Sequence, residues 1–200
     1  IIQGLTEFLP VSSSGHLELG RALLGIQTTN SLTFTVITHG ATVLSTIVVF
    51  RQEIFAILKG LLVPRWTENH EYAGKLVLSM IPVGILGAIG QEQVEQLFSG
   101  QLALVGGALL LTGLILYLTT KVYNRGLALK SGHAVIIGIA QAIAVIPGIS
   151  RSGATIGTAL LMGVDRSQAT RFSFLMVLVP VIGATALKVR TLITEGPPAG

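Results

Sequence analysis

The sequence predicts an all-α, polytopic integral membrane protein with two inverted-topology repeats, each containing a broken, re-entrant helix pair. Composition gives the membrane part of this prediction. Half of the 200 residues are hydrophobic, only 11% are charged, and the mean hydropathy is +0.76. A soluble domain carries roughly twice that charged fraction. Several apolar runs also approach the length of about 20 residues that a helix needs to cross a bilayer.

A duplicated polar motif predicts the two repeats. Ser12-x-Ser14-Gly15 recurs as Ser150-x-Ser152-Gly153, at an offset of 138 residues. At this offset, seven of the 34 positions in residues 3–36 are identical; the other identities pair Gln3 with Gln141, Leu23 with Leu161, Gly25 with Gly163 and Phe34 with Phe172. We therefore expect two copies of one structural unit that together build one site. Residues 3–16 are called the first motif below, and residues 147–155 the second motif.

Both motifs interrupt apolar segments. The short segment 1–9 stops at Pro10 and resumes as a helix over 16–24, and the segment 133–146 stops at Pro147 and resumes over 154–163. Irregular backbone within a membrane is tolerated only where protein buries it or it lines a wet cavity. Each motif is therefore predicted to form a helix–break–helix unit at membrane depth.

The remaining apolar runs predict full spans at 32–50, 73–90, 101–120 and 172–188, with a kink at Pro82 in the second. An interfacial amphipathic helix is expected at 53–63, and an acidic loop with Glu92 and Glu95 follows the second span. Arg166 and Arg171 are expected to precede the last span.

The basic residues indicate orientation rather than nucleic-acid binding, although the isoelectric point is near 9.8. Nine of the 13 Lys and Arg residues fall on one predicted side, which is therefore cytoplasmic; they are Arg51, Lys59, Arg65, Lys75, Lys121, Arg125, Lys130, Arg166 and Arg171. The two repeats then run in opposite directions, so their breaks face each other near the midplane. The absence of cysteine excludes disulfides and thiolate metal sites.

We expect residues 1–200 to form a single transmembrane domain. The first repeat covers about 1–50, linking spans cover 51–130, and the second repeat covers about 131–190. The chain begins without Met inside an apparent helix and ends just after a span. We therefore expect it to be a fragment, with further sequence at both ends.

Both motifs predict an anion site. Each Ser-x-Ser-Gly directly precedes a helix, and helix N-termini offer unpaired N–H groups and a positive dipole end. Arg151, with Ser150 and Ser152 beside it, adds a planar guanidinium suited to phosphate. The competing interpretation is a structural ion pair between Arg151 and Glu7, since a charge at membrane depth needs a partner.

The first motif also carries groups for acid–base and nucleophilic chemistry. Gln3 and Glu7 are four residues apart and share one helix face. Glu7 could orient a base, hold a divalent cation or pair with the arginine. Ser13 and His16 are close enough in the chain for a hydroxyl–imidazole contact that activates a nucleophile. Any serine here could instead cap a helix, and for Ser12 or Ser14 capping is the better interpretation. His39, within the first span, is expected to hydrogen-bond a neighbouring helix.

The two motifs, Gln3-Gly-Leu-Thr-Glu-Phe-Leu-Pro-Val-Ser-Ser-Ser-Gly-His16 and Pro147-Gly-Ile-Ser-Arg-Ser-Gly-Ala-Thr155, resemble those of the undecaprenyl-diphosphate phosphatase family, the bacitracin-resistance type. The resemblance covers essentially the whole chain and implies the same inverted-repeat, re-entrant fold. It also implies further transmembrane helices after residue 200.

The resemblance implies hydrolysis of undecaprenyl diphosphate to the monophosphate at the outer face of the bacterial inner membrane. This recycles the lipid carrier for wall polymers and confers bacitracin resistance. It assigns Ser13 as nucleophile, His16 as acid/base, and Glu7 as the second acidic residue of an E/Q-x-x-x-E pattern. Ser150 and Arg151 bind phosphate, and we expect Gln3, Ser12, Ser152 and Gly153 to assist them.

A divalent cation, Mg or Ca, is implied by the resemblance alone. Gln3 stands where many members have glutamate, so Glu7 is the better metal ligand. The expected partners are the lipid substrate and the bilayer, with no nucleic acid; the oligomeric state is open, a homodimer included. His16 or water as the nucleophile stays an alternative. The competing function is a polyprenyl-phosphate flippase, which would use the same anion site without a nucleophile.

Overall fold

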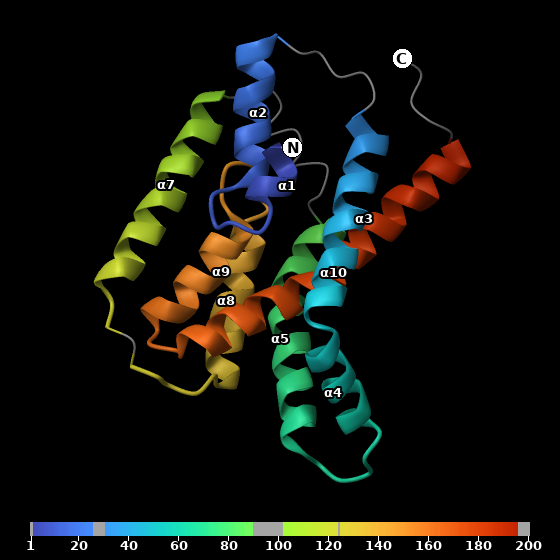
Figure 1. Cartoon of the computed structure of the whole chain (residues 1–200), viewed down its shortest axis with the longest axis vertical. Helices are drawn as coiled ribbons and strands as arrows, with labels where there is room; N and C mark the ends of the chain where they lie inside the picture. Colours follow the sequence, from blue (N-terminus) through green and yellow to red (C-terminus); the bar gives the residue numbers. More distant parts are fainter. Residues whose placement is uncertain (1, 26–30, 90–101, 124, 196–200) are drawn as a thin grey trace.

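The computed structural model describes residues 2–25, 31–89, 102–123 and 125–195. These residues form helices joined by short turns, and the one isolated bridge in this part of the chain pairs Leu127 with Val164. The helices are α1 (Ile2–Thr6), α2 (Ser13–Leu24), α3 (Ser31–Val49), α4 (Arg51–Leu61), α5 (Glu68–Ile89), α7 (Leu102–Lys121), α8 (Ser131–Ile143), α9 (Arg151–Leu161) and α10 (Arg166–Glu195) (Figure 1). The predicted all-α class is confirmed.

Long apolar helices confirm a multi-pass membrane protein. Three segments are long and apolar enough to cross a membrane: Glu68–Ala88, Leu102–Lys121 and Arg166–Leu187. A fourth candidate is the pair Gly40–Val49 and Arg51–Leu61, which is bent by 75°. The bend falls where the apolar run ends at Arg51, as the sequence predicts.

Four helices begin three or more residues earlier than the sequence predicts. α2 begins at Ser13 rather than at 16, and α9 begins at Arg151 rather than at 154, because a serine at the start of each Ser-x-Ser-Gly caps the helix. The other two are α10 and α5. α10 starts at Arg166, because the Asp165 carboxylate accepts hydrogen bonds from the N–H groups of Ser167 (3.0 Å) and Gln168 (3.1 Å) and caps the helix. Arg166 and Arg171 therefore lie within α10 rather than before it. α5 likewise starts at Glu68, and the acidic residues of its first turn suit the positive helix end. The predicted acidic loop lies outside the described residues.

The buried core lies where α8, α9 and α10 meet, with α5 packed against it (Figure 1). Its members are small or medium apolar side chains around one aromatic ring: Leu129, Ala134, Ile137, Ala159, Val164, Ala169, Phe172 and Met176. Many other large apolar side chains face outward along the helices. Such an apolar exterior is what a lipid environment requires. A second buried cluster, formed by Ala108, Ala144, Ile149 and Ala154, packs around the second motif.

Candidate active site

In the first motif, a helix cap fixes the polar residues. α1 ends at Thr6 and α2 begins at Ser13, with Ser12 as its N-cap. The Ser12 hydroxyl accepts a hydrogen bond from the Gly15 N–H at 3.2 Å and lies 3.3 Å from the Ser14 hydroxyl. Capping of this kind satisfies a backbone donor that the helix itself leaves unpaired.

The second motif makes the same set of capping hydrogen bonds. Ser150 caps α9, its hydroxyl accepts from the Gly153 N–H at 3.1 Å, and it lies 3.3 Å from the Ser152 hydroxyl. The first residue inside the helix is Ser13 in α2 and Arg151 in α9. At the offset of the sequence repeat, these two residues occupy equivalent positions.

The motifs also touch each other reciprocally. A Cβ on Gly15 would lie 3.0 Å from the Gly148 Cα, and a Cβ on Gly153 would lie 3.0 Å from the Pro10 carbonyl oxygen. Pro10 and Gly148 are themselves equivalent at the repeat offset. The Ser152 hydroxyl adds a long hydrogen bond, 3.4 Å, to the Leu9 carbonyl. The two helix starts therefore face each other across a close backbone contact that only glycine allows.

A cavity of about 520 Å³ opens beside this contact. One wall is apolar and comes largely from α10, through Phe174, Val177, Leu178 and Val181. The polar side chains that line the cavity are Gln3, Glu7, Ser12, Ser13, Ser14, Glu18, Arg21, Thr42, Thr46, Gln141, Ser150, Arg151, Ser152, Ser173 and Thr185. Polar groups beside an apolar wall suit a ligand with a charged head and a hydrocarbon tail.

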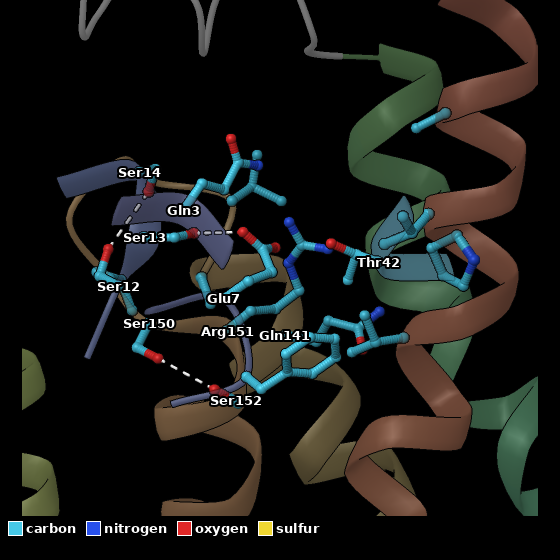
Figure 2. Close-up of a pocket in the computed structure, with 18 of the residues that line it drawn as sticks. Gln3, Glu7, Ser12, Ser13, Ser14, Thr42, Gln141, Ser150, Arg151 and Ser152 are labelled. Carbon is cyan, nitrogen blue, oxygen red and sulfur yellow. Dashed lines mark hydrogen bonds between the residues drawn. The ribbon is translucent and has the colours of Figure 1, made fainter. Parts of the chain in front are cut away.

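Figure 2 shows the side chains of Glu7, Ser13 and Arg151 extending into this cavity from both motifs. The Ser13 hydroxyl donates a hydrogen bond to the Glu7 carboxylate at 2.7 Å. In the described part of the chain, the ion pairs are Arg21–Glu18 and Lys75–Glu71, so Arg151 has no carboxylate partner. The Glu7 carboxylate on the same cavity acts on Arg151 electrostatically without forming a salt bridge, so the partly buried guanidinium can still pair with an anionic ligand. The structural ion pair with Glu7 is not formed.

His16 lies apart from these groups. Its Nδ1 donates to the Ser12 carbonyl at 2.8 Å, its side chain is exposed, and it does not line the cavity. The predicted contact between the Ser13 hydroxyl and the His16 imidazole is therefore absent, because the serine proton goes to Glu7. Since Nδ1 donates, Nε2 is the acceptor of the neutral ring.

A buried threonine of α7 anchors the second motif. The Thr112 hydroxyl accepts from the Ser150 N–H at 3.1 Å and lies 3.1 Å from the Gly148 carbonyl, to which it can donate. Gly148 itself has a φ of 96° and packs against α7 at Val105 and Ala108. The turn before α9 is thus held by α7, a helix that lies outside both sequence repeats.

Most of the predicted site residues line the cavity: Gln3, Glu7, Ser12, Ser13, Ser150, Arg151 and Ser152. Gly153 contributes its capping N–H instead. Sequence reasoning missed the Glu18–Arg21 pair at 2.8 Å, although both residues are within seven positions of Ser14 on the same helix. It also missed Thr112, whose role depends on a contact 38 residues away in the chain. The side chain of His39 lies outside the described part of the structure, so the expectation for it stays a prediction.

The oxygen donors that could hold a cation are few. No group of three or more His, Cys, Asp or Glu side chains gathers anywhere in the described segments. Glu7 is the carboxylate at the motif contact, with the amides of Gln3 and Gln141 on the same cavity. This set fits Mg²⁺, which is commonly bound through one or two carboxylates together with substrate phosphates.

Fold and site define a polytopic helical membrane protein with one polar cavity suited to an amphipathic anion. The bacitracin resistance protein BacA family model matches residues 1–198, and the chain belongs to that family. It is 53% identical to an undecaprenyl-diphosphatase of Christiangramia forsetii, over 93% of this chain and 71% of the relative. It is 45% identical to that of Parabacteroides distasonis, over 100% and 76%. It is 40% identical to an undecaprenyl-diphosphatase of Korarchaeum cryptofilum, over 94% of this chain and 74% of the relative.

Proposed function

We propose that the protein hydrolyses undecaprenyl diphosphate to undecaprenyl phosphate and phosphate, which recycles the lipid carrier of cell-wall synthesis and confers bacitracin resistance. Its family and the names of its relatives support this function. The observation in the structure that carries it is the 2.7 Å bond from Ser13 to Glu7 in a cavity shared with Arg151. A hydroxyl, a base and a cation are the groups that phosphoryl transfer needs.

In this mechanism the Arg151 guanidinium and the N–H groups at the starts of α2 and α9 bind the diphosphate. The prenyl chain lies along the apolar wall of α10. Charge that develops on the transferring phosphoryl is stabilised by groups already in place, which is the main source of catalysis in such reactions.

The Ser13 oxygen attacks the terminal phosphorus, and Glu7 accepts the hydroxyl proton. The bond to the bridging oxygen breaks, so undecaprenyl phosphate leaves and the phosphoryl group stays on the serine. Glu7 gives the serine proton to the departing undecaprenyl phosphate and is again a carboxylate. Water then attacks the phosphoserine phosphorus and gives a proton to Glu7, the bond from phosphorus to the Ser13 oxygen breaks, and Glu7 returns the proton to that oxygen as phosphate leaves. His16 is the alternative base, and its Nε2 is the atom that would act.

A divalent cation would be held by Glu7, assisted by the amide oxygen of Gln3. When bound, it would neutralise part of the charge on the diphosphate. Each of these residues lines the cavity, and the residues of the chain supply the remaining steps.

We further infer a single transmembrane domain with inverted repeats in the bacterial inner membrane, its cavity open to the outer face. α2 and α9 run in opposite directions from the motif contact, while the turns after α4 and α7 lie at one end of the molecule (Figure 1). Those turns carry Arg65 and Arg125, which favours that end as the cytoplasmic one. The equivalent caps and the reciprocal glycine contacts support an inverted pair.

A polyprenyl-phosphate flippase is the second candidate, because opposed broken helices around a central site are typical of carriers. Phosphate release from a prenyl diphosphate by the purified full-length protein in detergent, with and without a chelator, separates the two. We expect release by the wild type and its loss in Ser13→Ala. Hydrolysis absent under every cation, with lipid movement in vesicles retained by Ser13→Ala, would establish the carrier instead.

A further inference from the structure

Unpaired polar atoms gather at the cavity. Four buried side-chain atoms in the described residues have no hydrogen-bond partner: Gln141 Oε1, Ser173 Oγ, Thr185 Oγ1 and Tyr72 Oη. The first three belong to residues that line the cavity, and Tyr72 does not. Native proteins pair almost all of their buried polar groups, so unpaired atoms in residues that line one cavity are candidates for binding a ligand.

Gln141 is the clearest case. Its residue is 1% exposed, and it extends from α8 into the space that Arg151 also enters (Figure 2). An amide acceptor that is buried without a partner lowers the stability of the protein. A methionine of similar size would avoid that loss. The position therefore contributes something other than stability.

Ser173 on α10 has the same character, since it is 2% exposed and its hydroxyl is unpartnered. Thr185 is 12 residues further along that helix, which corresponds to roughly 18 Å at the rise of an α-helix. It is too far along to share one small ligand with Ser173. Gln141 and Ser173 are therefore the pair to consider together with the arginine.

We propose that Gln141 and Ser173 bind the diphosphate headgroup, as a set of ligands additional to Arg151 and the two helix starts. A protonated phosphate oxygen donates to Gln141 Oε1, and the Ser173 hydroxyl donates to an unprotonated oxygen. Both atoms then gain the partners that they lack in the free protein. The proposal rests on the proposed function for its ligand, because a diphosphate offers both kinds of oxygen.

The test compares Gln141→Met and Ser173→Ala with Tyr72→Phe in the full-length protein in detergent. Of the four unpartnered atoms, the Tyr72 hydroxyl is the one whose residue does not line the cavity, and Tyr72→Phe removes it. Two quantities are measured: the kinetics with farnesyl diphosphate, and the rise in Tm caused by its non-hydrolysable methylene diphosphonate analogue. We expect Gln141→Met to raise KM about tenfold, as for the loss of one hydrogen bond to a charged ligand.

The same variant should leave kcat within a few-fold, keep or raise the Tm of the free protein, and lose most of the Tm rise with the analogue. Ser173→Ala should act in the same direction, and Tyr72→Phe should change neither KM nor the analogue effect. An unchanged KM and analogue effect in Gln141→Met, or a lower Tm with normal KM, would overturn the proposal. If the wild type binds the analogue through Gln141 but releases no phosphate, the binding inference stands and the phosphatase fails.

Discussion

The two motifs share a capping pattern and divide the polar side chains between them. Each starts a helix with a capping serine, a neighbouring hydroxyl and a glycine three residues after the cap. They differ at the first helical position, where one has Ser13 and the other has Arg151. This comparison teaches that two equivalent helix starts can place a hydroxyl and a guanidinium at matched positions, facing the same cavity.

The motifs also differ in how they are held. Ser150 has an ordinary φ of −70°, and Thr112 binds its N–H. Ser12 has a φ of 65°, the one non-glycine residue of the described chain with a positive value. Backbone in that region is unfavourable for serine and persists only where the surroundings enforce it. The first motif, which carries Ser13, is thus the one with backbone strain. The second motif, which carries Arg151, is the one that Thr112 anchors.

The largest effect is expected from removing the guanidinium of Arg151. Arg151→Ala should lower kcat/KM by about 10³- to 10⁵-fold, the range found for arginines that stabilise a transferring phosphoryl. Arg151→Lys should recover only part of the loss, because lysine cannot bind two phosphate oxygens with a planar fork. The measurement is steady-state hydrolysis of a prenyl diphosphate. Equal activity of the lysine variant and the wild type would contradict a bidentate role.

On the other side of the comparison, Ser13→Ala and Glu7→Gln should each lower kcat by about 10²- to 10⁴-fold. Ser14→Ala is the matched control, since Ser14 lines the same cavity but bonds only to Ser12. His16→Ala separates the two candidate bases in the same assay. A loss in His16→Ala that exceeds the loss in Glu7→Gln would return the role of base to the histidine.

Gly15→Ala tests the contact between the motifs. The added methyl would lie 3.0 Å from the Gly148 backbone and 2.8 Å from a Leu109 side-chain carbon, and overpacking of this kind costs about 1–3 kcal/mol. We expect lower thermal stability and lower kcat, since Ser13 and Arg151 move apart. Gly106→Ala, on α7 with open space around it, should be neutral or stabilising by up to about 1 kcal/mol. If Gly15→Ala changed neither the thermal stability nor kcat, the motifs would not be in close contact.

The smallest effect concerns the anchor of the second motif. Thr112→Val keeps the shape but leaves the Ser150 N–H unpaired, at a cost of about 1–3 kcal/mol. Thr112→Ser should restore stability and activity together. Thr119→Val is the control, because the Thr119 hydroxyl bonds only within α7, to Leu116 at 2.7 Å. Thermal unfolding and kcat/KM are the measurements, and equal effects of the two valine variants would remove the anchoring role.

Much of this arrangement is predictable from the sequence because it is local. Apolar runs and prolines predict the helices and their breaks. The repeated Ser-x-Ser-Gly predicts two equivalent helix starts, although each helix begins three residues earlier than predicted, directly after Ser12 and Ser150. Polar residues in an apolar chain also predict that Glu7 and Arg151 face one site. The bond from Ser13 to Glu7 is not predictable, since it depends on how the turn after α1 folds back. The same holds for Thr112 and Gln141, whose importance comes from neighbours that only the packed structure reveals.

The distance along the chain between the two motifs has a consequence for biosynthesis. Ribosomes add about 5–20 residues per second, so the second motif emerges roughly 7–28 s after the first. During that interval the segment around the strained Ser12 lacks two later contacts, that of Gly148 with Gly15 and that of Ser152 with the Leu9 carbonyl. A nascent chain halted before α9 therefore contains the hydroxyl and its base without the cation, and it cannot hydrolyse substrate before the second half is inserted.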